Sequence, residues 1–454
     1  MRVHRRLIFV VGWVCIVFAL APAGAFESTL APPQLIGQLE ARGYENIDAQ
    51  LVGDVLVVWC ENRRIRYPVT WMSEALWLAA SSVSPERRVR VVAEKFGRPV
   101  VALEARAEDV VRWMAQELPT ALFRDLLTAE YAGDEYPAER ANSSLRRVDL
   151  TLGPGRLLSQ FGLAGAWIKA DFDASARLTT ALAPGLAASG WMFIPLYNKG
   201  GPVDVEDRYS EVRPGSFLVS LFQPLGRSTF STATVGAFEL GRWQYDTYGV
   251  TVDVDHATLD GRWTVGASVG YLGSATYRVR SDRPPPGERY RIWEIVWPPD
   301  IWPYEARVAY RFDGLDFHVI GRWGRFLNGD RGWRLDLRRN FGEVEVTVFG
   351  IKSDYRLGGA DPVDRNQVRL VGGMRLEVPI FPRQRGMPRR FRVTPAQSFA
   401  WSYRYRPGDS GIDVTTEYRV EDLVGEYNPG DLRNNLDRAR AQVHSIARSD
   451  EPKQ

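Results

Sequence analysis

The most constraining feature of this sequence is a period-two alternation of charged and apolar residues that begins near residue 145. Residues 333–338 read Trp-Arg-Leu-Asp-Leu-Arg, and residues 343–348 read Glu-Val-Glu-Val-Thr-Val. Successive side chains of a β-strand point to opposite faces, so each such strand has one apolar and one charged face. The pattern is compatible with a soluble β-sandwich, and equally with a barrel whose apolar face contacts lipid.

The first residues are typical of a secretory signal peptide. Arg2, Arg5 and Arg6 precede an apolar run over 7–20, and Ala23-Gly24-Ala25 follows. A basic region, a short apolar region and small residues form an export signal with its cleavage site. We therefore expect residues 1–25 to be removed by cleavage after Ala25.

This cleavage changes the charge of the chain. It removes three arginines and no acidic residue, so the formal net charge falls from +3 to 0 (3 − 3 = 0). A role with a nucleic-acid partner then loses its main support. Cys60 is the only cysteine after cleavage, which excludes an intrachain disulfide. Later segments lack the length of an apolar transmembrane helix, so membrane entry would require a β-barrel.

Residues 30–135 combine helix and strand signals. Helices are expected at 34–42, 71–82 and 107–118, and strands at 48–52, 55–60, 88–93 and 99–103. This is enough for a small α+β domain with its own core. A linker with a short helix, 120–144, follows it.

Connection lengths in the strand region alternate. Tight turns at 183–185, 223–227, 260–261, 313–314 and 340–342 separate mostly longer loops; the arginine-rich stretch 381–395 breaks this rule. We expect a mainly β fold, a transmembrane antiparallel β-barrel of about 14 strands (about 12–16) over residues 145–420. An even count places both ends on the short-turn rim, which faces the periplasm in such barrels. The α+β domain and a polar tail, 421–454, would lie there.

The aromatic and charged residues fit this arrangement. Tryptophans near expected strand ends are typical of the aromatic girdles at a membrane interface: Trp167, Trp191, Trp263, Trp323, Trp333 and Trp401. The charged side chains expected to face the lumen are Lys169, Asp171, Arg177, Asp253, Arg334, Asp336, Arg338, Glu343, Glu345, Arg375 and Glu377.

Candidate chemical sites have simpler structural interpretations. Asp330 with Arg325 and Arg331 suggests a carboxylate–guanidinium site, but a tight hairpin with local hydrogen bonds is favoured. Glu343 and Glu345 are expected to neutralise arginines of the neighbouring strand. His256 and His318 have no metal-ligand spacing around them. We expect no catalytic residue, no cofactor and no metal.

A tryptophan-containing loop leaves two alternatives open. Trp293, Trp297 and Trp302 are suited to stacking on sugar rings, and they are equally suited to anchoring at the interface or plugging the barrel.

Several motifs resemble those of the YjbH-like exopolysaccharide-biosynthesis family of Gram-negative outer membranes. One is the hairpin Gly324, Arg325, Phe326, Leu327, Asn328, Gly329, Asp330, Arg331 and Gly332, followed by Leu335-Asp336-Leu337. Ala183-Pro184-Gly185, Ser189-Gly190 and 194–198 resemble an earlier hairpin, and Gly372-Gly373 with Val378-Pro379 resemble a late segment.

The resemblance implies a non-catalytic role in export or assembly of a surface polysaccharide. Its expected partners are outer-membrane lipid, the polysaccharide and periplasmic export or assembly proteins. A general porin or a barrel scaffold for partner proteins is the alternative, although a porin does not need the α+β domain. An outer-membrane enzyme comes third.

Overall fold

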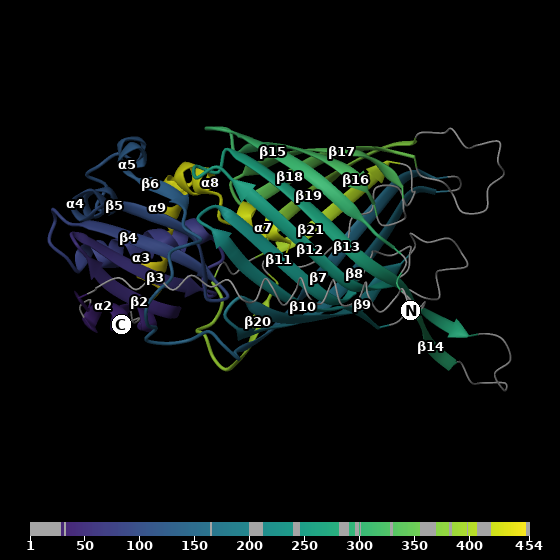
Figure 1. Cartoon of the computed structure of the whole chain (residues 1–454), viewed down its shortest axis with the longest axis horizontal. Helices are drawn as coiled ribbons and strands as arrows, with labels where there is room; N and C mark the ends of the chain where they lie inside the picture. Colours follow the sequence, from purple (N-terminus) through teal and green to yellow (C-terminus); the bar gives the residue numbers. More distant parts are fainter. Residues whose placement is uncertain are drawn as a thin grey trace, which may run out of the picture.

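The computed structural model describes residues 29–30, 33–163, 166–198, 212–238, 246–280, 290–295, 299, 301–326, 330–354, 369–380, 384–396, 398–405 and 419–450. The expected signal peptide, residues 1–25, lies outside these described residues. An α+β domain stands at one end of a much larger sheet, and the strands of that sheet wrap around part of the carboxyl-terminal chain (Figure 1).

The α+β domain contains a six-stranded sheet in sequence order. Its strands are β1 (Thr29–Leu30), β2 (Tyr44–Val52), β3 (Val55–Asn62), β4 (Arg88–Lys95), β5 (Arg98–Arg106) and β6 (Thr128–Tyr131). Its helices are α2 (Pro33–Ala41), α3 (Pro68–Ser81), α4 (Ala107–Met114) and α5 (Thr120–Leu126). The predicted helices and hairpins are therefore confirmed, while β6 lies in the segment that was expected to be a linker.

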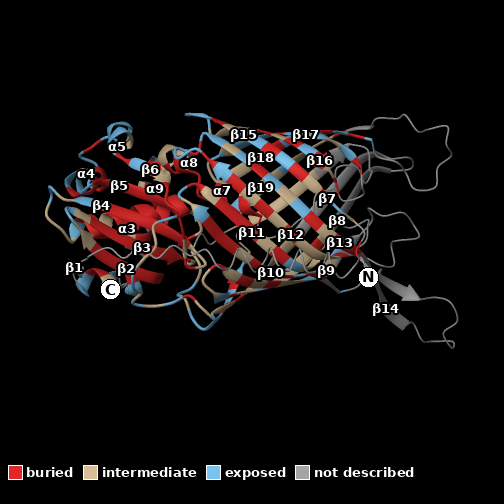
Figure 2. Cartoon of the chain, viewed as in Figure 1, coloured by how far each residue is buried: buried red, intermediate tan, exposed pale blue. Residues whose placement is uncertain are grey.

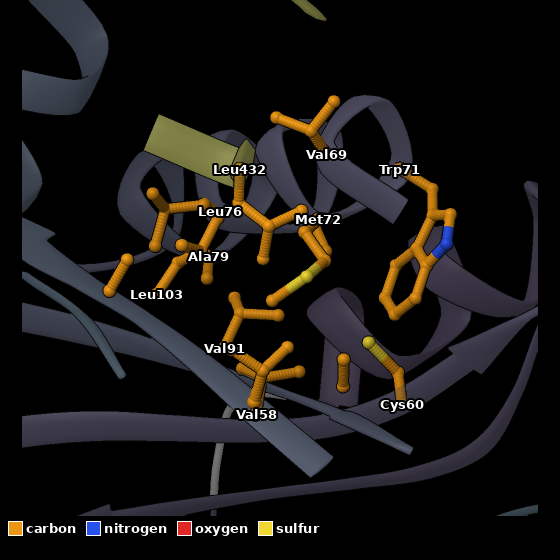
Figure 3. Close-up of a cluster of buried hydrophobic side chains, with 14 of the residues drawn as sticks. Val58, Cys60, Val69, Trp71, Met72, Leu76, Ala79, Val91, Leu103 and Leu432 are labelled. Carbon is orange, nitrogen blue, oxygen red and sulfur yellow. The ribbon is translucent and has the colours of Figure 1, made fainter. Parts of the chain in front are cut away.

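Helix α3 forms the centre of the domain core. Pro68 stands in its first turn, where a missing N–H costs nothing, and most of the helix is buried. Figure 3 shows side chains from α3, from the sheet and from the carboxyl-terminal chain in one cluster: Val69, Trp71, Met72, Leu76, Ala79, Val58, Cys60, Val91, Leu103 and Leu432. The core of this domain therefore includes a residue more than 300 positions away in the sequence.

The large sheet confirms the prediction of a mainly β chain. Its described strands are β7 (Val148–Leu163), β8 (Ala166–Ala183), β9 (Leu186–Asn198), β10 (Arg213–Gly226), β11 (Thr229–Phe238), β12 (Asp246–Ala257), β13 (Trp263–Arg280), β14 (Tyr290–Ile295), β15 (Tyr304–Phe312), β16 (Phe317–Arg325), β17 (Arg331–Phe341), β18 (Val344–Ser353), β19 (Arg369–Pro379), β20 (Phe391–Pro395) and β21 (Ser398–Tyr405). The predicted tight turns each join two antiparallel neighbours.

Strand order departs from the expected pairing at one place. The path runs β12-β11-β10-β9-β8-β7-β21-β19-β18-β17-β16-β15-β13-β14, and β12 also pairs with β13. All these pairs are antiparallel except β21 with β7, which is parallel, as is β20 with β7. Because β21 and β7 run in the same direction, β21 ends away from the rim where β7 begins. Among the described strands, the last one therefore ends at the rim opposite to the short-turn rim that was expected.

The two faces of the sheet differ in character. We call the inner face the one that carries buried Asp253, Glu305 and Asp336, and the outer face its opposite. On β17, Asp336 is 2% exposed, whereas Leu335 is 40% exposed. The period-two alternation is visible as alternating buried and exposed positions along the strands in Figure 2. The expected segregation of charged and apolar residues is therefore present.

The carboxyl-terminal region, expected from its composition only as a polar tail, is helical over most of its described length. It forms α7 (Val420–Glu426), α8 (Pro429–Asn434) and α9 (Leu436–Asp450). Helix α7 packs against β11 and β12, α8 against β6, and α9 against α3. Apolar residues at helical spacing cause this, because Leu436, Ala439, Val443 and Ile446 are all buried in the domain core.

The α+β domain meets the sheet at its short-turn end. The Gly185 N–H donates to Phe96 O (2.7 Å), and the Gly133 N–H donates to Arg227 O (2.8 Å). Gly185 has a φ of +79°, and a Cβ there would collide with Phe222 O and approach the Arg98 side chain. The turn thus requires glycine for its backbone conformation and for close packing. Among the described helices, none is long and apolar enough to cross a membrane.

Candidate functional site

Charged side chains on the inner face surround the start of α7. They come from four strands and from the chain entering α7, and they are buried or nearly so. We call this group the inner ion network: Asp253, Asp255, Glu305, Arg307, Arg322, Asp336, Arg419 and Glu421.

Two arginines of the sheet form the centre of the network. Arg307 Nη2 lies 2.7 Å from Asp255 Oδ1, and its Nε lies 3.4 Å from Glu421 Oε2. Arg322 contacts three acids: Asp336 at 3.0 Å, Glu305 at 3.1 Å and Glu421 at 2.9 Å. Buried ion pairs require such multiple contacts, because desolvation of each charge opposes burial.

Residues of the α7 segment complete the network. Arg419 Nη2 donates to Glu305 Oε1 at 3.2 Å, and Glu421 accepts from Arg322. Burial disfavours the charged form of Glu421, but Arg322, Arg419 and Arg307 outweigh it and hold the pKa of Glu421 well below its ordinary value. Helix α7 is therefore fixed to the inner face by charge as well as by packing.

A second polar contact fixes α8 near the short-turn end. Asp431 accepts from Arg311 Nε at 2.6 Å, and its other oxygen lies 3.1 Å from His318 Nε2. Asn428 caps α8 and donates through Nδ2 to Gly261 O at 2.8 Å. His318 thus has an acidic partner that local spacing could not indicate, because Asp431 lies 113 positions away in the sequence.

Some of the expected lumen charges form pairs along or between strands. Arg334 pairs with Asp336 (2.8 Å), Arg338 with Glu345 (3.7 Å), and Arg375 with Glu377 (2.9 Å). Arg177 lies over the Trp191 ring. Asp253 belongs to the inner ion network; Lys169 and Asp171 lie in β8, and their side chains fall outside the described part.

Two expected placements are wrong. Glu343 stands in the turn before β18 and accepts from Gln442 Nε2 of α9 at 2.6 Å, so its described contact is not with a neighbouring strand. Trp191 shares the inner face with buried Phe193, since the alternating Met192 and Ile194 are exposed, so it is not part of an outer girdle. The bends in β8 and β9 pairing make facing hard to count from sequence there.

The motif hairpin joins β16 to β17. Gly324 and Gly332 face each other in register, and a Cβ at either would collide with a neighbouring carbonyl oxygen. The Phe326 N–H donates to Asp330 O at 2.8 Å, while the Arg331 N–H donates to Asp354 at 2.5 Å. Arg325 pairs in register with Arg331, and Leu327, Asn328 and Gly329 lie outside the described residues. These contacts agree with the hairpin interpretation.

The tryptophan loop is only partly described. Trp293 lies in β14, Trp297 is outside the described residues, and Trp302 packs at 4.3 Å between ring centroids on Tyr271. Trp302 is 36% exposed. Sugar stacking, anchoring at the interface and plugging of the barrel therefore stay predictions for this loop.

Sequence reasoning missed a serine motif and most of the inner ion network. Residues 266–270 read Gly-Ala-Ser-Val-Gly, but Ser268 lies within β13 and pairs in register with Asp253 and Glu305. A nucleophile elbow instead needs a sharp strand-to-helix turn. The alternation of charged and apolar residues could have placed Glu305, Arg307 and Arg322 on the inner face. Arg419 and Glu421 lie outside the alternating strands, so the sequence pattern could not place them there.

Within the described ranges, no group of three or more His, Cys, Asp or Glu residues is arranged to hold a metal ion.

Comparison with known sequences identifies a family. The family described as exopolysaccharide biosynthesis protein YbjH (YjbH) matches residues 27–356, which includes the α+β domain and the strands up to β18. Comparisons with curated proteins and with solved structures gave no match. The matched part contains the Gly324–Gly332 hairpin and the 183–185 turn, whereas Gly372-Gly373, Val378-Pro379 and α7–α9 lie beyond it. The chain therefore belongs to the YjbH family of exopolysaccharide biosynthesis proteins.

Proposed function

We propose that this protein is an outer-membrane β-barrel that assists export or assembly of an exopolysaccharide by binding and positioning the polymer, without catalysing a reaction. Its α+β domain, with α8 and α9 packed on it, would lie in the periplasm after cleavage behind Ala25, and α7 would lie against the inner face of the barrel. The observation that carries the proposal is the contrast between the apolar outer face and the charged inner face of one continuous sheet.

The outer face supports contact with lipid. Large apolar side chains are exposed on neighbouring strands: Val265, Val269, Val308, Leu335, Leu337 and Val348. Soluble monomers rarely expose a contiguous apolar area of this kind. The first strand of the path, β12, also pairs with β13 near the other end of the path. This pairing supports closure of the sheet into a barrel without free edges.

Aromatic residues on the outer face support the same orientation. Three strands carry two aromatic residues eight positions apart: Trp263 and Tyr271, Tyr304 and Phe312, and Trp333 and Phe341. At about 3.3 Å per residue, this spacing is about 26 Å along the strand. In transmembrane barrels, the aromatic girdles flank an apolar band about 25 Å tall. Because barrel strands are tilted, the height that this spacing spans across the membrane is somewhat smaller than that band.

The inner face supports a hydrated interior. Its arginines and carboxylates provide hydrogen-bond partners for water and for a polar polymer, and the α+β domain offers a surface for periplasmic export proteins. A general porin is less well supported, because α7 lies against the inner face and α9 ties it to the domain. A catalytic role in the outer membrane would require a nucleophile and base, which we do not assign.

Two experiments test the proposal. In a clean deletion strain without a redundant copy, surface and secreted polysaccharide should fall, and the full-length gene should restore them. Unchanged polysaccharide would contradict the export role. The protein should fractionate with outer membranes and migrate faster in an electrophoresis gel when unheated; release in a periplasmic extract would contradict the barrel.

A further inference from the structure

A group of arginines lies where β20 and β21 meet β7. These strands are not the ones that α7 chiefly packs on. Arg392 extends from β20 and Arg177 from β8, while Arg385 stands in the loop before β20. Arg63 reaches the same place from the α+β domain. Helix α7, in contrast, packs chiefly against β11 and β12.

The carboxylates at this junction are already engaged. Asp149 on β7 is 3% exposed and accepts from Arg392 at 2.7 and 2.9 Å and from Arg63 at 3.0 Å. Glu45 accepts from Arg63 at 2.7 Å and pairs with Arg147 at 2.7 Å. Even when Asp173 on β8 and Glu61 beside Arg63 are added, four carboxylates of the described residues stand near five guanidinium groups, so cationic charge is in excess among them.

Arg385 carries part of that excess. Its backbone N–H donates to Arg64 O at 2.8 Å, but among the described residues its side chain has no ion-pair partner, and its buried Nε has no hydrogen-bond acceptor. Burial, with the charges of Arg392, Arg177 and Arg63, lowers the pKa of Arg385 to about 10 despite Asp149. An anion placed here would relieve this repulsion.

An aromatic surface with free donors adjoins the arginines. Arg177 Cζ lies 5.2 Å from the centroid of the Trp191 ring, which faces it in register on β9. Trp191 Nε1 and Ser189 Oγ are buried on the same face without hydrogen-bond partners in the described part of the chain. A buried donor without an acceptor is costly, so a ligand that offers oxygens is favoured.

We propose that Arg177, Trp191 and Arg385, supported by Arg63 and Arg392, form a binding site for acidic sugar units of the polymer, which we call the seam site. A guanidinium group binds a carboxylate through paired hydrogen bonds, and the indole ring packs on the apolar face of a sugar while Nε1 and Ser189 Oγ reach its oxygens. The inference rests on the proposed function and specifies its substrate class as carboxylated.

Binding to the purified full-length protein in detergent tests the site. Calorimetric titration with oligogalacturonate should give saturable binding that weakens with added salt, whereas neutral maltohexaose should not bind. Arg385→Gln and Trp191→Ala should each weaken oligogalacturonate binding about tenfold or more. The control Arg389→Gln changes an exposed arginine of the same loop and should bind as the unaltered protein does.

Heat-dependent gel migration establishes that each variant is folded, and Trp191→Phe keeps a ring if Trp191→Ala does not fold. Equal affinity in all variants, equal binding of maltohexaose, or no binding of oligogalacturonate would each overturn the seam site. The deletion experiment separates the two proposals. Polysaccharide lost on deletion together with unaltered binding in the variants contradicts the site alone, and unchanged polysaccharide together with Arg385-dependent binding contradicts the export role alone.

Discussion

Glu421 Oε2 in α7 lies 2.9 Å from Arg322 Nη1 on β16, although 99 positions separate the two residues. The same carboxylate lies 3.4 Å from Arg307. One side chain of the carboxyl-terminal segment therefore contacts two arginines of the sheet, which also pair with carboxylates of the sheet itself. Removal of this charge should weaken the attachment of α7 more than removal of an exposed charge from the same helix.

The first prediction concerns Glu421→Gln. Loss of the carboxylate leaves buried Arg307 and Arg322 with one acidic partner fewer. Breaking a buried ion pair lowers the stability of a folded protein by about 3–5 kcal/mol. Because Glu421 is partly exposed, we expect a loss of stability at the lower end, about 3 kcal/mol. Hydrogen exchange of the α7 amides should accelerate accordingly. The control Glu426→Gln changes an exposed residue of α7 that pairs with Lys95 of β4. It should lower stability by less than about 1 kcal/mol. Equal exchange in both variants would contradict the assigned role of Glu421.

The second prediction concerns pH. Burial raises the pKa of Glu94 to about 7, in spite of Arg140 at 2.8 Å. A folded-state pKa above the ordinary 4.5 means that the folded chain binds more protons than the unfolded chain between these values. The contribution of this group to stability is therefore fully present below pH 4.5 and lost as the pH rises towards 7.

Glu94→Gln should remove this part of the pH dependence, because its side chain stays neutral at every pH. Denaturant unfolding at several pH values between 4.5 and 7.5 measures the difference between the variant and the unaltered protein. Glu139→Gln, an exposed change in the neighbouring loop, serves as the control. A stability difference between Glu94→Gln and the unaltered protein that is independent of pH would contradict the raised pKa.

The strand region was predictable because charged and apolar residues alternate in it. This alternation identifies a segment as a strand and also shows which of its residues share a face. The turns around Gly185 and Gly342 and the Gly324–Gly332 hairpin were also readable, because glycine at such positions reports backbone conformation or close packing. The family resemblance had the same source and is confirmed by the match over residues 27–356.

The carboxyl-terminal helices were not predictable by the same reasoning. Segment 420–450 is polar in composition, and its apolar residues are a minority that becomes significant only when α3 and the inner face are in place. Arg419 and Glu421 find their partners over a long sequence separation, and the parallel pairing of β21 with β7 leaves no local signature. Tertiary contacts determined these features.

The third prediction concerns the outer face. Leu335 is 40% exposed in the middle of β17, so Leu335→Lys would place a charge in lipid and should cost about 2–4 kcal/mol if the sheet spans a membrane. Arg338→Lys keeps a charge on the inner face and should cost less. Folding into lipid vesicles, followed by denaturant titration, measures both. Equal cost for the two variants would indicate that the outer face does not contact lipid.

The last prediction links α7 to passage through the proposed barrel. Because Glu421 pairs with Arg307 and Arg322 of the inner face, and Arg419 pairs with Glu305, α7 should restrict ion flow while Glu421 is charged. In planar lipid bilayers, the full-length protein should show low conductance at neutral pH, and Glu421→Gln should open more often or to a higher level. Since the pKa of Glu421 is held well below its ordinary value of 4.5, acidification to about pH 5 should not reproduce the effect of the variant. Glu426→Gln should conduct as the unaltered protein does. Conductance that is equal in all three proteins would show that α7 does not limit the passage, even if its ion pairs stabilise the fold.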